Sequence, residues 1–278
     1  MLLKAQTAIP FTISPTNHFI IEGKLNETFA RFILDSGAGR CCLGAAKAAE
    51  MDLVIVEIQQ TASGVGEGFM NRFEVLVPQM ILGNCVINNA TMVGLDLQGV
   101  NQSLEGIGES EVYGIIGADL LLEYGVVLDF KKMEADFEGA LPFKRMRSNH
   151  LVAEVRLAGM EEKVRFIIDT GAGQTCIDLE KIKALGWELK ESEEKATGAG
   201  GSGMPLSVAT IPKMTFGDYV LFEYQMTIMD LAHVNEVLVE MGAKSVDGII
   251  GADVLWDNNG VIDCGTKLLY LEQKKNAQ

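Results

Sequence analysis

The sequence GIIGADLL at residues 114–121 returns as GIIGADVL at residues 248–255, an offset of 134 residues. The same offset relates Asp-Ser-Gly-Ala-Gly at 35–39 to Asp-Thr-Gly-Ala-Gly at 169–173. A repeat of this length is a duplicated domain and not the short unit of a solenoid. The sequence therefore predicts two similar lobes in one chain of 278 residues.

The boundary between the two copies is expected in the basic, polar stretch 144–149, which has no apolar periodicity. This division predicts an N-terminal lobe over 1–145 and a C-terminal lobe over 146–278. Upstream of the Asp motifs, Asn17-His18 corresponds to Asn149-His150 at an offset of 132 residues. The second copy therefore carries two extra residues before its Asp, and we expect a longer hairpin turn to absorb them.

Within each lobe the pattern is mostly that of β-strands. Apolar and polar residues alternate at 29–34 and at 164–168, and both runs end directly at an Asp motif. After the second motif, Asp178 as the cap, 179–185 as the body and Gly186 as the stop predict a short helix. We expect a mostly β chain with short helices, in which each Asp lies where a strand ends.

The two candidate catalytic residues are Asp35 and Asp169, one from each copy. Two carboxylates about 3 Å apart cannot both ionise, so they share one proton. Such a pair acts as a base toward a water molecule and as an acid toward a substrate carbonyl, without a metal or a covalent nucleophile. The duplicated motif therefore indicates hydrolysis by an activated water.

The residues that follow each Asp are expected to support the two catalytic loops. Gly37 and Gly171 let the backbone turn tightly beneath the carboxylate, where a side chain would clash. The hydroxyl groups of Ser36 and Thr170 can reach the backbone of the opposite lobe. We expect these hydroxyls to lock the two loops together.

These motifs and their order resemble the retropepsin-like aspartic peptidases. The resemblance covers both lobes, and bacterial aspartyl-peptidase-like proteins are the nearest likeness. It implies two tandem, pseudo-twofold-related acid-protease β-barrel lobes, with 115–117 and 249–251 threaded behind the catalytic loops. It also implies a peptide or protein substrate, no cofactor, and activity as a monomer, because both halves of the site are fused in one chain.

Two glycine-rich segments are candidates for substrate-binding flaps. Glycine at the tip of a β-hairpin suits a lid that opens for a peptide and closes over it. The alternative is a pair of flexible surface loops, and neither segment has the Tyr of pepsin-like enzymes. The candidate flap residues are Gly64, Val65 and Gly66 in the first copy and Ala199, Gly200 and Gly201 in the second.

Competing signals are weaker. Gly198, Gly200 and Gly203 match GxGxxG, but a highly charged run precedes them and no helix pattern follows, which argues against a dinucleotide. The three histidines show no metal-ligand spacing, and we expect structural or surface roles and no metal. Asp119 and Asp253 begin short helices, so we expect them to cap free N–H groups.

Composition limits the partners. A formal net charge of −15 argues against nucleic acid, and no apolar run approaches the roughly 20 residues of a membrane span. Five scattered cysteines do not suggest a disulfide framework, which favours reduced thiols and a cytoplasmic location. A periplasmic or secreted location stays open if a signal peptide has been removed.

Two functions are compatible with these patterns. The first is an aspartic endopeptidase whose substrate lies in the cleft between the lobes. The second is a catalytically inactive peptide-binding or scaffolding protein of the same fold. The presence of both Asp residues, each followed by Gly-Ala, favours the endopeptidase.

Overall fold

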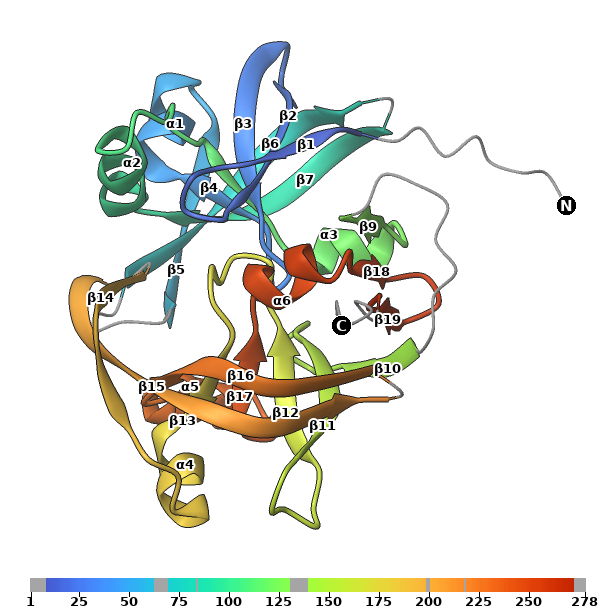
Figure 1. Cartoon of the computed structure of the whole chain (residues 1–278). Coiled ribbons are helices and arrows are strands. Elements are labelled where there is room, and N and C mark those ends of the chain that lie inside the picture. The colour runs from blue at the N-terminus through green and yellow to red at the C-terminus, as the bar shows by residue number, and fades with distance from the viewer. Residues whose placement is uncertain are drawn as a thin grey trace, which may run out of the picture.

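The two copies of the repeat fold into two β-sheet lobes, one above the other in Figure 1. This computed structural model describes residues 9–62, 70–83, 85–130, 140–198, 201–217 and 219–272. The prediction of a mostly β, two-lobe fold is confirmed, because long antiparallel strands make up most of both lobes and the helices are short.

The first lobe contains an eight-stranded sheet in the order β1-β2-β3-β8-β4-β7-β6-β5. An additional pairing of β2 with β6 closes six of these strands into a barrel. The elements up to the end of this lobe's sheet are β1 (Phe11–Ile13), β2 (Phe19–Leu25), β3 (Thr28–Leu34), β4 (Cys42–Gly44), α1 (Ala45–Glu50), β5 (Val54–Ala62), β6 (Met70–Leu82), β7 (Cys85–Leu95), α2 (Gln98–Glu105), β8 (Gly114–Ile116) and α3 (Ala118–Glu123).

The second sheet has eleven strands in the order β14-β15-β16-β13-β17-β12-β11-β10-β19-β18-β9. Here the extra pairing of β15 with β11 closes a barrel of six strands that correspond to those of the first lobe. The remaining elements are β9 (Val127–Asp129), β10 (Ala140–Arg145), β11 (Leu151–Leu157), β12 (Val164–Ile168), β13 (Cys176–Asp178), α4 (Leu179–Leu185), β14 (Lys190–Gly198), β15 (Gly201–Phe216), β16 (Tyr219–Met229), α5 (Ala232–Glu240), β17 (Gly248–Ile250), α6 (Ala252–Asp257), β18 (Val261–Asp263) and β19 (Leu268–Tyr270).

The segment that joins the lobes belongs to the second sheet. β9 pairs with β18, and β10 pairs with both β11 and β19, so strands from both halves of the sequence join in the second sheet. Residues 1–145 therefore include two strands of the second sheet, and the division at residue 145 stays a prediction.

The predicted strands and helix lie close to their expected positions. β12 has the predicted bounds, β3 begins one residue earlier, and α4 covers 179–185 as expected, with Gly186 left-handed at its end (φ 65°). The capping bond predicted for Asp178 is absent. Its Oδ1 instead accepts the Leu231 N–H at 3.3 Å, which ties the start of α4 to the segment before α5.

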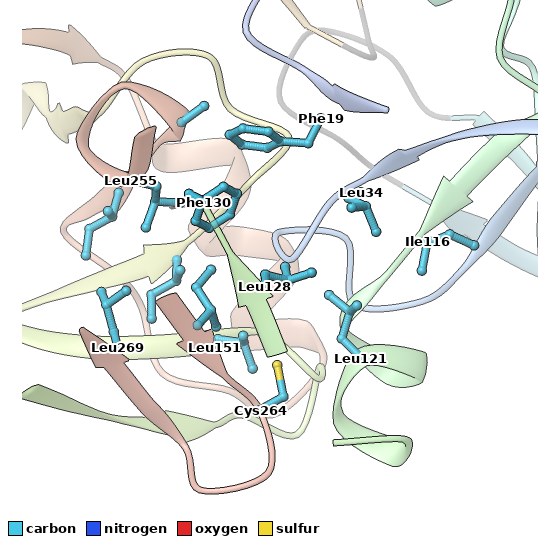
Figure 2. Packing of buried hydrophobic residues seen from close by; sticks show 14 of the residues in the cluster. Phe19, Leu34, Ile116, Leu121, Leu128, Phe130, Leu151, Leu255, Cys264 and Leu269 are labelled. Atoms are coloured by element: carbon cyan, nitrogen blue, oxygen red, sulfur yellow. The ribbon is translucent and has the colours of Figure 1, made fainter. Parts of the chain in front are cut away.

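One continuous hydrophobic core runs through both lobes. This cluster contains Phe19 and Leu34 from the first copy and Leu255 and Leu269 from the second, and Figure 2 shows these four side chains in one view. The rings of Phe19 and Phe130 lie 4.6 Å apart between centroids, in a tilted arrangement. Because burying apolar surface contributes about 25 cal/mol per Å², this shared core holds the lobes in a fixed relation and so fixes the groups between them.

Candidate active site

Each candidate catalytic Asp lies at the end of a central strand, as the strand pattern predicted. The backbone N–H of Asp35 donates to the carbonyl of Ile116 at 3.0 Å, and that of Asp169 donates to Ile250 at 2.9 Å. β8 and β17 lie parallel to β3 and β12 in this region. The duplicated Ile-Ile-Gly strands thus lie beside the catalytic loops and support them from behind.

The two carboxyl groups are held identically by their own loops. Asp35 Oδ1 accepts the N–H groups of Gly37 (2.8 Å) and Ala38 (2.9 Å). Asp169 Oδ1 accepts those of Gly171 (2.8 Å) and Ala172 (3.0 Å). Each carboxylate therefore has one oxygen fixed by backbone donors and one oxygen left for the partner and a substrate.

The structure brings the two Asp side chains together at the interface between the lobes. Burial, the charge of Asp35 and a side-chain hydrogen bond with Asp35 together raise the pKa of Asp169 well above its usual range, and the N–H groups of Gly171 and Ala172 oppose this shift. Asp169 therefore keeps its proton at pH values at which an exposed carboxyl group loses it.

The glycines of the motif pack against the opposite carboxyl group. A Cβ atom on Gly37 would overlap the carboxyl group of Asp169, and one on Gly171 would overlap that of Asp35. These glycines are therefore required for the approach of the two lobes, in addition to the tight turn expected from the sequence.

The two hydroxyl groups form a reciprocal set of hydrogen bonds between the lobes. Ser36 Oγ donates to the Ile168 carbonyl (2.8 Å) and accepts the Thr170 N–H (3.1 Å). Thr170 Oγ1 donates to the Leu34 carbonyl (2.7 Å) and accepts the Ser36 N–H (2.8 Å). Both side chains are fully buried, so every donor and acceptor depends on its partner across the interface.

Thr170→Val is expected to lower the free energy of unfolding by about 2–6 kcal/mol. Valine keeps the shape but leaves the Ser36 N–H and the Leu34 carbonyl unpaired, at a cost of about 1–3 kcal/mol each. Chemical denaturation measures the change, and the exposed strand residue Thr12, changed to Val, is the matched control with an expected change within about 0.5 kcal/mol. Equal losses in the two variants would contradict this role of Thr170.

Asp119 and Asp253 accept most of their hydrogen bonds from residues outside their helices, which corrects the prediction that they cap these helices. Asp119 accepts the Cys41 N–H (2.9 Å) and its thiol (3.1 Å). Asp253 accepts the Thr175 N–H (2.9 Å), the Thr175 hydroxyl (2.6 Å) and the Tyr224 hydroxyl (2.6 Å). Each Asp also accepts the N–H of the residue that follows it, at 2.8 and 2.7 Å, so capping is only part of its role.

The same contacts hold the end of each catalytic loop. Cys41 Sγ accepts the Gly117 N–H at 3.2 Å, and Thr175 Oγ1 accepts the Gly251 N–H at 2.9 Å. The strand after each loop is thereby tied to the Ile-Ile-Gly segment behind it. Sequence reasoning missed this role, although Cys41 and Thr175 occupy the same place in the two copies.

The predicted flaps belong to two antiparallel hairpins on one side of the molecule, β5–β6 and β14–β15 (Figure 1). Residues Gly64, Val65, Gly66, Ala199 and Gly200 lie outside the described part of the chain. Gly201 begins β15 and pairs with Gly198. At the other hairpin, an ion pair of 3.2 Å joins Glu74 on β6 to Arg40, which follows the first catalytic loop.

Two histidines lie near the Asp pair, which sequence reasoning did not anticipate. Asp35 acts electrostatically on both His18 and His150, and the backbone of Gly37 interacts with His150. His233 lies on α5, away from this pair, and its Nδ1 is 3.9 Å from Glu236. Among the residues that the structure describes, no group of His, Cys, Asp and Glu side chains could hold a metal ion.

The residues assembled here suit acid–base chemistry. A carboxyl group whose pKa is raised by burial and by the charge of Asp35 faces a second carboxyl group, and the backbone donors bind only one oxygen of each. The pair can accept a proton from water and deliver one to an oxygen or nitrogen atom of a substrate.

None of the helices in the described ranges is long and apolar enough to cross a membrane.

Comparison with known families finds a match in both halves of the chain. A family model described as aspartyl protease matches residues 21–120 and again residues 153–254. The two matched segments contain the two Asp loops and the two Ile-Ile-Gly strands.

A solved structure has the same arrangement of lobes. The aspartic proteinase from Irpex lacteus superposes with a TM-score of 0.52 at 14% sequence identity, covering 95% of this chain and 96% of that chain. At this identity the likeness shows the fold alone. No curated protein sequence matches the chain.

Proposed function

The chain belongs to the aspartyl protease family, and from that membership we propose that it is an aspartic endopeptidase with an intramolecular dyad of Asp35 and Asp169. The observation that supports this most strongly is the facing pair of carboxyl groups, in which burial and the charge of Asp35 raise the pKa of Asp169. The substrate is a peptide or protein, and the monomer contains the whole site.

In the proposed reaction the dyad acts first as base and acid together. The ionised carboxylate accepts a proton from a water molecule, whose oxygen attacks the carbonyl carbon of the peptide bond. The protonated carboxyl group, assigned to Asp169, donates its proton to the carbonyl oxygen. The product of this step is a neutral tetrahedral diol, and the dyad again holds one proton.

The second step breaks the carbon–nitrogen bond. The dyad's proton moves to the amide nitrogen, one hydroxyl of the diol returns its proton to the dyad, and the bond's electron pair leaves with the amine. The products are a carboxylic acid and an amine, and the dyad ends with the single proton with which it began. Backbone donors hold both carboxylates in place for this exchange.

An extended peptide is expected to bind as an added strand between the two hairpins. The glycine-rich segments would close over it as flaps. Support for this role comes from the hairpins that carry both segments and from the ion pair between Arg40 and Glu74, which links one hairpin to a catalytic loop.

Activity is expected to extend from weakly acidic into near-neutral pH. Burial and the charge of Asp35 disfavour ionisation of Asp169, so the proton that the reaction needs is retained above the usual carboxyl range. Side chains of Ala38 and Ala172 offer no hydroxyl that would stabilise the charged form. A profile of kcat/KM from about pH 3 to about pH 8 measures the limits, and activity confined to strongly acidic pH would contradict this prediction.

A further inference from the structure

The two histidines near the dyad lie in equivalent turns at the start of each copy. In the first turn the Ser14 N–H donates to the His18 carbonyl at 2.8 Å. In the second turn the Met146 N–H donates to the His150 carbonyl, also at 2.8 Å. The repeat has therefore duplicated this turn together with the catalytic loop.

Each turn lies against the catalytic loop of the opposite copy. Asn149 Nδ2 donates to the Gly39 carbonyl at 2.9 Å, and a Cβ atom on Gly39 would overlap the Ser148 carbonyl and lie 3.5 Å from His150 Cε1. The first turn likewise lies against the second catalytic loop, since a Cβ on Gly173 would lie 3.2 Å from the Thr16 carbonyl. The turns and loops are thus in direct contact across the interface.

Hydroxyl groups orient the two rings in the same way. His18 Nδ1 is 2.7 Å from Thr16 Oγ1, and His150 Nδ1 is 2.7 Å from Ser148 Oγ. The backbone of Gly37 interacts with the His150 ring. A neutral ring fits the hydroxyl contact if Nδ1 accepts the hydroxyl proton while Nε2, on the far side of the ring from the hydroxyl group, carries the ring proton.

The surroundings favour the neutral form of both rings. Burial lowers the pKa of His18 and of His150, the charge of Asp35 opposes this shift in both cases, and for His150 a hydrogen bond with the backbone of Gly37 opposes it as well. The cationic side chains at the second turn include Arg147, within the turn itself, and Arg145, whose Nε and Nη2 donate to Asn149 Oδ1 at 2.9 and 2.6 Å. A cation already lies beside the second turn, which adds to the cost of a second one there.

We propose that His18 and His150 are a pseudo-symmetric pair of positioning residues that support the dyad in their neutral form and set the acid limit of activity. This inference rests on the proposed function. Protonation of either ring places a positive charge beside Asp35, which makes the dyad a weaker base toward water. It also buries a charge at the contact between a turn and a catalytic loop.

The direction of the pH effect follows from the burial. A histidine whose pKa is lower in the folded protein than in the unfolded chain stabilises the fold above its unfolded pKa of about 6.5, and this contribution is lost as the pH falls below that value. Two such rings at one interface change the stability of the fold in the same direction as the pH falls. Acidification therefore weakens the docking of both turns while it reduces the basicity of the dyad.

Variants that cannot be protonated test the proposal by their pH profile. His18→Gln with His150→Gln keeps hydrogen-bonding capacity, so activity near neutral pH should remain within about threefold while the acid limit moves down by about one pH unit. His150→Leu, which cannot bind Ser148, should lower kcat about tenfold with little change in KM. His233→Gln is the matched control and should leave the profile unchanged, and an unmoved acid limit in the double Gln variant would overturn the proposal.

A second readout is independent of activity. The chain has three histidines, so His233→Gln leaves two ring Cε1–H resonances for a proton NMR titration. Both should titrate below about pH 6.5, and lower still when Asp35→Asn removes the charge that favours the protonated ring. Titration at or above about pH 6.5, or no response to Asp35→Asn, would overturn the placement of the rings. Absence of cleavage by the wild-type protein would instead overturn the peptidase function.

Discussion

Asp35→Asn and Asp169→Asn are each expected to lower kcat/KM by about a thousandfold or more, because either change removes the shared proton system and general acid–base catalysis contributes about 10²–10⁴-fold. The two losses should be similar, since both carboxyl groups have the same backbone donors. Initial rates of peptide cleavage at matched protein concentration measure the effect. An active single variant would contradict the assignment of both residues to one dyad.

The double variant should be no worse than either single variant, because residues that act as a unit are strongly non-additive. An equimolar mixture of the two single variants should stay inactive. Recovery of activity in the mixture would mean that Asp35 and Asp169 are contributed by different chains. That result would contradict the single-chain site while leaving the protease chemistry intact.

Unfolding does not explain the expected loss. The pKa of Asp169 is raised by folding, so its ionisation costs stability above the unfolded value, and replacement by neutral Asn should leave the fold as stable or slightly more stable at neutral pH. Asp96→Asn makes the same change in charge at an exposed residue that accepts the Gln98 N–H at 2.9 Å, which Asn can also do. This control should retain full activity.

Gly37→Ala and Gly171→Ala are expected to reduce activity to the background level, because each added methyl group would occupy the position of the opposite carboxyl group. The lobes must then separate or the carboxyl group must rotate away from its backbone donors, and a misplacement of about 1 Å is enough for a loss of about a hundredfold. Steady-state kinetics and thermal unfolding together measure the effect. We expect a lower melting temperature, since the contact between the lobes is also disturbed.

The matched control for this substitution is Gly99→Ala in α2. Apart from its chain neighbours and the backbone of its own helix, no heavy atom of the described residues lies within 4 Å of the Cβ that it would introduce, and alanine is the better helix former. Activity should be unchanged and stability equal or slightly higher. Normal activity in Gly37→Ala would mean that the two loops do not approach each other as closely as the structure shows.

Much of the fold could be predicted from the sequence because the same order of strands and motifs occurs in both copies of the repeat. The 134-residue offset identified two lobes, and the alternating runs before Asp35 and Asp169 predicted the strands that end there. The crossing of β9 and β10 into the second sheet could not be predicted. Strand pairing between distant segments depends on tertiary packing, and these short strands have no distinctive pattern.

Some residues of the candidate site could be predicted from the sequence and others could not, and the reason is physical. Ser36 and Thr170 lie within the two Asp motifs themselves, so their role could be inferred although their hydrogen-bond partners are in the opposite lobe. His18 and His150 lie 17 and 19 residues before the Asp of their own copy, and the turns that carry them contact the other copy's catalytic loop. A single sequence contains no signal for such a contact, because the approach of the lobes creates it.

The most direct test of the central claim is cleavage of a diverse peptide library, read by mass spectrometry, with the wild-type protein shown to be monomeric under the assay conditions. New termini from internal peptide bonds should appear at weakly acidic to neutral pH, and a pepstatin-like inhibitor or either Asp→Asn change should abolish them. Peptide binding without any new termini, or equal cleavage by wild type and Asp169→Asn, would contradict the proposed dyad.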